Sequence, residues 1–561
     1  MISTTLKMKT KMKIFLGRSV LKTLCLVALT VSAHSILAIS DVAAQTIRYV
    51  KQGGAGNGSG LDWDNASADL QTMIDQDGVD EVWVAAGTYY PMYDHLGNDN
   101  PGDPRTKTFR MKNGVKIYGG FSASLTGADG SVAGRTDIHG VNATILSGDL
   151  GVKEDDSDNA YNVFYNYFDS PGEGNPVTAL TTALLDGFII EKGNANGEET
   201  GTPVPLIGSG GGIMNRLASP TLQNLIIRDN YGTNGGGIHN RGANPVLNNV
   251  TITNNASASG GGVYNQHIVA AGTFYSEPIF DNVQISDNTA TSVGGGVYNS
   301  SSNPELTNVK ILGNTASTNG GGIYNVNSSP RLTEVIIEEN ISVPDAGEFG
   351  GGGIYNITGS SPKLTNVIIR NNKASRGGGV YNYGTASGTT VTPEFVNTII
   401  SGNLAKEYGG GIYNRTSADP TLKNVLISGN TAAQGGAGVH SFDANSTTTF
   451  THVTIAGNWS SVGTGAGLTG DGGILQNSIV ADNYSGAGMA SSNIDAASLK
   501  VSYSLVSDGS FDDEGNNISS IAHFRWSRAA TSTSDTTTAG DYQLTGISPA
   551  INAANDTYAD G

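Results

Sequence analysis

Acidic side chains beside a recurring asparagine are the residues of this sequence best suited to chemistry. Asp229, Asp287, Glu338 and Glu339 each precede such an asparagine by one or two positions, and Arg370 stands near the next asparagine along the chain. A polysaccharide lyase needs carboxylates, often with calcium, beside an arginine or lysine base, and a glycoside hydrolase needs carboxyl groups at a defined separation. Neither arrangement is evident, so the sequence favours a solvated ladder of opposite charges, with a functional cleft as the alternative.

Histidines and acidic loops give weaker signals. His239 and His440 take a position that tyrosine holds in other repeats, and His452 replaces a repeat asparagine, so structural roles are predicted for all three. The acidic loops 94–103 and 154–158 suit calcium in an extracellular setting, but neither has the spacing and distal glutamate of an EF-hand. We therefore predict no cofactor and no metal site, and keep calcium as the alternative.

Two motifs alternate from residue 210 onward. The first is G-G-G-[I/V]-x-N, and its closing residues are Asn215, Asn240, Asn265, Asn299, Asn325, Asn356, Asn382 and Asn414. The second is P-x-[L/F]-x-[N/E]-x-x-I-x-x-N, and it begins at Pro220, Pro245, Pro278, Pro304, Pro330, Pro362, Pro393 and Pro420. The second motif keeps its length in all eight copies while the whole repeat does not, so insertions are confined to the junctions.

Side-chain parity predicts a corner within the second motif. Leu222 and Asn224 share one parity and Leu225 and Ile227 the other, so a continuous strand would expose half of these residues. Asparagine tolerates the left-handed backbone conformation that such a corner requires. We expect the residues of this position to form a structural ladder, which consists of Asn224, Asn249, Asn282, Asn308, Asn366, Asn397 and Asn424.

Each repeat is expected to hold three very short strands. Such strands cannot bury an apolar face alone, but repeats stacked about 4.8 Å apart pair every strand with its neighbours and close an apolar interior. The sequence thus predicts an all-β, single-stranded parallel β-helix, with roughly ten coils in the repeat block and aligned aliphatic and asparagine side chains inside. Asn65 is expected to begin a short N-terminal capping helix, in which Leu70, Met73 and Ile74 share a face.

Two outward lines of side chains are candidate binding surfaces. Stacked tyrosines would form a flat platform for sugar rings, although strand propensity and self-stacking also explain them. They are Tyr264, Tyr298, Tyr324, Tyr355, Tyr381 and Tyr413. The second line is apolar, as partner surfaces often are, and consists of Ile336, Ile368, Ile399 and Leu426. The insertions 266–277 and 383–392 follow the same motif, so they lie on one edge and suit variable recognition.

The first 44 residues predict export. Basic residues from Lys7 to Lys22 precede an apolar run at 24–33 and the small residues 42–44, as in a secretory signal peptide. No later stretch reaches the roughly 20 apolar residues of a transmembrane helix, and the only cysteine, Cys25, lies in the leader. Loss of the leader changes the net charge from −18 to about −23, which repels nucleic acid and anionic membranes.

The repeats resemble right-handed parallel β-helix proteins of the pectin-lyase-like superfold, specifically bacterial surface proteins with G-G-G-I-Y-N repeats related to the chlamydial polymorphic outer-membrane protein repeat. EVWVAAGTYY at 81–90 and GVKIYGGF at 114–121 look like N-terminal coils of that group. SPAINA at 548–553 looks like the segment that precedes a variable C-terminal anchor in the group, although the sequence ends at Gly561. The resemblance covers nearly the whole mature chain and implies a place on the cell surface or outer membrane.

We therefore predict four segments: a signal peptide at 1–44, an N-terminal cap with irregular coils at 45–209, regular repeats at 210–483, and worn C-terminal coils with a second cap at 484–561. The preferred function is that of an exported, non-catalytic, monomeric adhesin or matrix component that binds glycans or proteins. The alternatives are a carbohydrate-active enzyme, either a polysaccharide lyase or a glycoside hydrolase, and a passive spacer.

Overall fold

The computed structural model describes residues 45–167, 180–198, 207–269, 273–343, 350–385, 388–470, 472–486, 490–496, 498–508, 516–520, 522, 524–526 and 541–544. The predicted signal peptide and the SPAINA segment lie outside these residues. Within them, no helix is long and apolar enough to cross a membrane.

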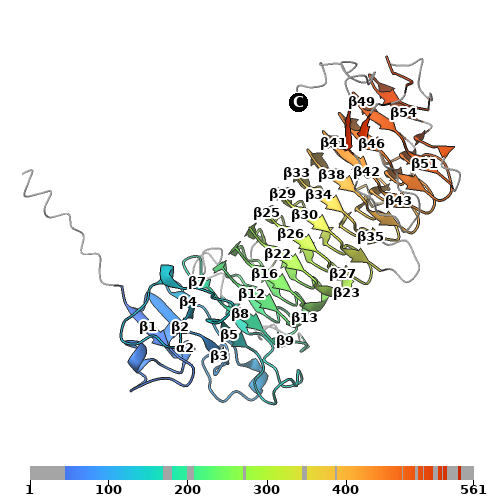
Figure 1. Cartoon of the computed structure of the whole chain (residues 1–561). Coiled ribbons are helices and arrows are strands. Elements are labelled where there is room, and N and C mark those ends of the chain that lie inside the picture. Colours follow the sequence, from blue (N-terminus) through green and yellow to red (C-terminus); the bar gives the residue numbers. More distant parts are fainter. Residues whose placement is uncertain are drawn as a thin grey trace, which may run out of the picture. The chain divides into compact units, whose positions relative to one another are not determined.

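The chain winds into a parallel β-solenoid whose strands lie one above the next in four sheets (Figure 1). The β1 sheet has 15 strands, from β1 (Ile47–Val50) to β54 (Leu499–Ser502), and the β3 sheet has 14, beginning at β3 (Gly87–Tyr89). The β6 and β9 sheets have 12 strands each and begin at β6 (Phe164–Tyr167) and β9 (Asn194–Ala195). The prediction of an all-β, parallel β-helix is thus confirmed.

One coil illustrates the arrangement. β28 (Ile323–Val326) lies in the β6 sheet, β29 (Arg331–Thr333) in the β1 sheet, β30 (Ile336–Glu338) in the β3 sheet and β31 (Ile341–Ser342) in the β9 sheet. The prediction of three strands per repeat is therefore wrong. The fourth strand of this coil has only two residues, which is too short to leave a periodic pattern in the sequence.

The repeat block has the predicted number of coils. Between residues 210 and 483 the β6 sheet contains ten described strands, from β10 (Ile213–Arg216) to β48 (Leu468–Gly470). Like residues pair across them, as Asn299 does with Asn325. A single cluster of buried apolar side chains runs from Val50 to Val506, so each coil seals the interior of the next.

Two ladders of buried asparagines run beside this core. In the β6 sheet, Asn299 Nδ2 donates to Asn325 Oδ1 over 2.8 Å, and this pattern repeats from Asn166 to Asn414. The asparagines that close the second motif form the other ladder. Each one bonds to the next coil and to a backbone carbonyl of the previous coil, and so satisfies polar groups that water cannot reach.

The third ladder follows the predicted corner on the outside of the coil. The seven corner asparagines have φ between 50° and 56°. Bonds of 2.7 to 3.3 Å join their amides, except where Glu334 stands between Asn308 and Asn366. Asn397 Nδ2, for example, donates to Asn366 Oδ1 over 3.3 Å at an exposed position. The left-handed backbone conformation, rather than ligand binding, explains why asparagine recurs at this corner of the coil.

Substitution at this corner separates conformation from hydrogen bonding. We expect Asn366→Ala to lower the free energy of unfolding by about 1–2 kcal/mol, because alanine disfavours the φ of 56°. Asn366→Gly loses the same exposed amide but tolerates the conformation, so its expected cost is less than about 1 kcal/mol. Denaturant unfolding of both variants measures the difference. Equal costs would show that the side-chain ladder, rather than the backbone conformation, is the stabilising feature.

The N-terminal helix begins later than predicted. α2 (Leu70–Asp75) is capped by Asp69, whose carboxylate accepts a hydrogen bond from Thr72 N over 3.0 Å, and Asn65 instead ends a 3₁₀ turn. The expectation that Asn65 caps the helix is therefore wrong, because that residue serves the preceding turn, which Asp62 caps. The predicted apolar face is present, and α2 packs against β1 and β2 (Glu81–Ala85) (Figure 1).

Candidate binding site

The tyrosine line stacks in register but does not form an open platform. Neighbouring ring centroids from Tyr264 to Tyr413 are 4.5 to 5.2 Å apart, and most pairs are nearly parallel. Most ring faces therefore lie against another aromatic ring rather than solvent. Tyr381 and Tyr413 are 1% and 0% exposed, and burial raises the pKa of Tyr324 to about 12. The predicted solvent-facing sugar platform is thus wrong for the buried Tyr264, Tyr355, Tyr381 and Tyr413, whereas Tyr298 and Tyr324 are partly exposed and ligand binding by them stays a prediction.

The glycine motif explains why these tyrosines are buried. A Cβ atom on Gly294, which has φ of +67°, would lie 2.9 Å from Tyr298 Cβ. Only glycine lets the preceding turn approach the tyrosine so closely. In the sequence, the three glycines before each tyrosine therefore indicate that the tyrosine side chain is covered.

The apolar line forms as predicted. Ile336, Ile368, Ile399 and Leu426 pair in register on adjacent strands of the β3 sheet. Ile399 is 38% exposed and the other three are partly buried. The strip is one side chain wide, between the corner ladder and polar side chains such as Glu338 and Arg370. A partner for it remains a prediction.

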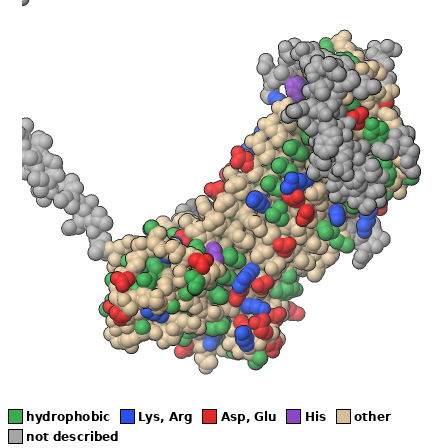
Figure 2. All heavy atoms as spheres, in the orientation of Figure 1, with side chains coloured by type: hydrophobic (Ala, Val, Ile, Leu, Met, Phe, Trp, Pro, Cys, Tyr) green, Lys and Arg blue, Asp and Glu red, His purple; other side chains and the backbone are tan. Residues whose placement is uncertain are grey.

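The acidic residues that could act in catalysis either form ion pairs or occupy corners of the coil. Arg370 Nε and Nη2 lie 2.8 Å from the two carboxylate oxygens of Glu338 one coil away. Asp287 and Glu339 occupy left-handed corners, as Gly313 does between them. Cross-coil pairs such as Lys363–Glu394 recur, and Figure 2 shows basic and acidic side chains interspersed on the visible face. The arrangement corresponds to a ladder of opposite charges.

The histidines also have structural surroundings. His239 is 1% exposed and stacks on Tyr264, and burial lowers its pKa to about 3. His440 stacks on Tyr413, and burial lowers its pKa to about 4. Both rings are therefore neutral at neutral pH, and His452 takes a left-handed corner with φ of 55°.

The acidic loops satisfy much of their charge with backbone amides. Asp94 accepts hydrogen bonds from Leu96 N, Asn98 N and Asn98 Nδ2, which hold the pKa of its carboxyl below its usual range despite desolvation. In the other loop, Asp158 Oδ2 accepts from Val152 N over 2.6 Å. In the part of the chain that the structure describes, no three acidic, histidine or cysteine side chains gather as metal ligands. Calcium remains a prediction.

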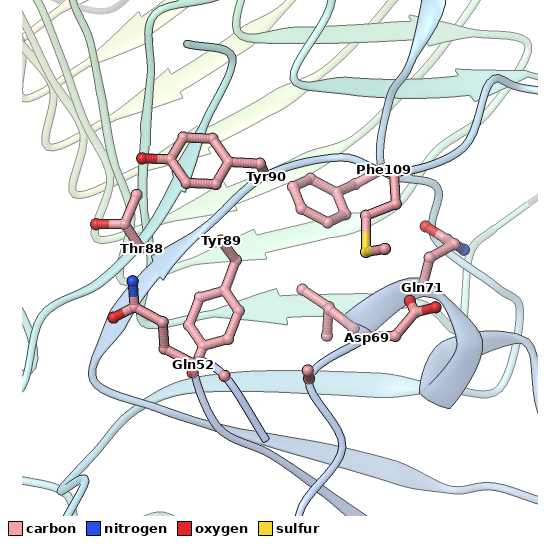
Figure 3. Close-up of a pocket in the computed structure, with 11 residues that line it drawn as sticks. Gln52, Asp69, Gln71, Thr88, Tyr89, Tyr90 and Phe109 are labelled. Atoms are coloured by element: carbon pink, nitrogen blue, oxygen red, sulfur yellow. The ribbon is translucent and has the colours of Figure 1, made fainter. Parts of the chain in front are cut away.

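A small pocket lies beside α2. It encloses about 260 Å³, and Figure 3 shows the rings of Tyr89, Tyr90 and Phe109 around it. Its buried polar groups are already bonded: Tyr89 donates to Ala85 O, and Asp69 binds Thr72 and Tyr93. The α2 pocket is therefore an apolar cavity the size of one ring or one side chain.

A larger and more polar cleft lies at the corner between the β3 and β9 sheets. We call this hollow of about 540 Å³ the corner cleft. Lys192, Asp229 and Asn254 occupy the corner on three successive coils, with φ of 66°, 54° and 55°. Its opposite wall comes from the acidic loop, through Asp156 and Asn159. A regular edge of the coil and an irregular loop thus enclose it.

The acidic loop is held firmly at the cleft by Arg105. The guanidinium donates to Asn159 O, Asn194 O and Asn196 Oδ1, each over 2.8 Å, and it lies 4.1 Å from the ring centroid of Tyr161. These bonds join the loop to the coil that carries the floor of the cleft. The site is preorganised rather than dependent on loop closure.

The corner cleft offers hydrogen-bond acceptors and one aromatic surface. Asn159 is 2% exposed, and its Oδ1 has no hydrogen-bond partner although its Nδ2 donates to Asp156 over 3.2 Å. Tyr231 is 40% exposed. Lys192, the one cation in the lining, donates to Glu154 over 3.2 Å. A ligand with several hydroxyl donors and an apolar face fits these groups.

Sequence reasoning found only part of this cleft. Asp229 was among the candidate carboxylates, and Asp156 lay in the loop considered for calcium. Asn159 and Lys192 were missed because they belong to irregular coils without a repeat pattern, and Tyr231 was missed although it directly follows the closing asparagine of a regular repeat. A positional signal existed, since Asp229 and Asn254 both precede the closing asparagine of a repeat.

The fold and its repeats define the class of protein: a parallel β-helix with glycine-rich repeats. Residues 308–326 and 397–415 match the Chlamydia polymorphic membrane protein repeat, which confirms the resemblance predicted from the G-G-G-I-Y-N motifs. A comparison with curated proteins finds no match.

Among solved structures, the surface protein and adhesin PfbA of Streptococcus pneumoniae is similar at 10% identity, with a TM-score of 0.30 over 77% of this chain and 92% of that chain. The GH136 lacto-N-biosidase from Eubacterium ramulus is also similar at 10% identity, with a TM-score of 0.26 over 81% of this chain and 67% of that one.

Proposed function

We propose that this protein is an exported surface protein that attaches to neutral glycans through the corner cleft. The observation that carries the proposal is the exposed ring of Tyr231 in a cleft whose lining also includes Asp156, Asp229 and Asn254. A sugar ring would stack on the tyrosine while its hydroxyls donate to these side-chain oxygens.

The charge of the cleft favours an uncharged ligand. Asp156 and Asp229 both line it, and its lysine is already paired with Glu154. An anionic sugar would therefore meet two carboxylates without a free cation. The predicted leader and the repeats of the chlamydial membrane-protein kind support a location at the cell surface.

Glycan-array binding followed by calorimetry on the full chain tests the proposal. We expect Tyr231→Ala to weaken binding of a neutral oligosaccharide about tenfold or more, the cost of one stacking contact. Tyr275→Ala is the matched control, because it removes another exposed tyrosine, 53% exposed and remote from the cleft lining, and its binding should be unchanged.

Two results would contradict this proposal. Loss of binding on Tyr90→Ala with no effect of Tyr231→Ala would place the sugar in the α2 pocket instead. Release of reducing ends from the oligosaccharide, abolished by Asp229→Asn, would establish the carbohydrate-active enzyme that we ranked second.

A further inference from the structure

Two arginines on adjacent coils have neither an ion-pair partner nor an acidic strand neighbour. Arg216 ends β10 and Arg241 ends β14 (Ile238–Arg241), and the two residues pair in register in the β6 sheet. Within the ranges that the structure describes, neither forms an ion pair. Adjacent like charges in a sheet repel each other.

Several other arginines and lysines of the described residues lie beside acidic side chains. Arg228, Arg370 and Arg376 each meet a glutamate across coils, at 2.8, 2.8 and 2.7 Å. Arg331 and Lys363 are also adjacent cations, but the strand neighbours on their outer sides are acidic: Glu305 and Glu394. The corresponding neighbours of Arg216 and Arg241 are Tyr167 and Gln266.

An aromatic ring and a β-hairpin lie beside the pair. On one side the guanidinium of Arg216 lies 4.9 Å from the ring centroid of Tyr167, which orients it. On the other side stands the hairpin of β19 (Ile268–Val269) and β20 (Thr273–Phe274), with Ile268 beside Gly242. The adjacent His239 is buried and, with its pKa of about 3, adds no charge at neutral pH.

We propose that Arg216 and Arg241 together bind one oxyanionic group, a carboxylate or sulfate, of an extracellular polysaccharide. Two guanidinium groups one coil apart can each direct N–H donors at the same planar or tetrahedral oxyanion, and the bound charge relieves their mutual repulsion. The net charge of the protein is −18, so long-range attraction does not recruit the anion and recognition depends on this local pair. The site is separate from the corner cleft and does not rest on glycan binding there.

Thermal unfolding and surface binding of the full chain test this proposal. The variant Arg216→Gln/Arg241→Gln is compared with Arg331→Gln/Lys363→Gln, which removes the same charge from the adjacent cations that have acidic neighbours. Sodium sulfate, a sulfated oligosaccharide and an oligogalacturonate are the probes, each against chloride at equal ionic strength. We expect at least one of the two saccharide probes to raise the unfolding midpoint of the parent and the control, but not of the Arg216/Arg241 variant.

Binding to immobilised saccharide gives the second readout. For the saccharide that binds, we expect about tenfold or greater loss in the Arg216/Arg241 variant and a change of less than about twofold in the control. Binding of the sulfated chain alone assigns a sulfate ester, binding of the oligogalacturonate assigns a carboxylate, and both together assign a general oxyanion site. Three results would overturn the proposal: protection by sodium sulfate alone, equal protection of all three proteins, and protection of none.

Discussion

Replacing Asn340 by leucine lowers the free energy of unfolding by about 3–5 kcal/mol. Its Nδ2 donates to Asn372 Oδ1 over 3.0 Å and to Ile311 O over 2.9 Å. Its Oδ1 accepts from both Asn314 N and Asn314 Nδ2 over 3.0 Å. Leucine has similar volume but removes these bonds and leaves the buried backbone N–H of Asn314 without its acceptor, and each hydrogen-bonding group left unsatisfied costs about 1–3 kcal/mol.

Denaturant unfolding measures this loss, with Asn366→Gly as the control that removes an amide from the exposed ladder. The control should cost less than about 1 kcal/mol, because water replaces the lost partner. If Asn340→Leu proved as mild as the control, the internal ladder would not be a source of stability. Hydrogen exchange of the Asn314 amide gives a local check, since that amide should exchange faster in the variant.

The sequence predicted the solenoid because the same restraint recurs in every coil. Position within the repeat distinguished inward-facing residues such as Ile337 from outward-facing residues such as Ile336. Side-chain parity identified the corner at Asn366. The fourth strand was missed for a physical reason. Its residues in one coil, Thr315 and Ala316, are too few for a periodic pattern, and only pairing with the next coil defines them as a strand.

The candidate sites were harder to predict because they depend on which neighbours cover a side chain. Parity placed Tyr381 on the outer side of its strand, but outward did not mean exposed, because stacked rings and glycine turns bury it. The corner cleft combines a repeat position, Asp229, with Asn159 from an irregular loop. No spacing in the sequence relates those two residues. The lack of an acidic neighbour beside Arg216 and Arg241 likewise appears only when strand register is known.

Replacing Gly321 by alanine should cost about 1–3 kcal/mol, although only one methyl group is added. A Cβ atom there would lie 2.5 Å from Ile341 O and 2.6 Å from Gly352 O, and both atoms are backbone. Neither carbonyl can move alone, because each belongs to a segment hydrogen-bonded to the coils beside it. The coils must therefore separate locally, which weakens burial and hydrogen bonds together.

The cost arises from stacking rather than from backbone conformation, since Gly321 does not have the left-handed φ that its neighbour Gly320 has. Gly102→Ala is the matched control, because a Cβ atom at Gly102 meets nothing within 4 Å and its φ also lies outside the left-handed region. Thermal unfolding should separate the two variants clearly, with Gly102→Ala close to the parent. A mild effect of Gly321→Ala would mean that coils can move apart at small cost, as they must where Ala437 and Ala466 hold this position, and the close backbone contact would then not explain why glycine occupies it in the earlier coils.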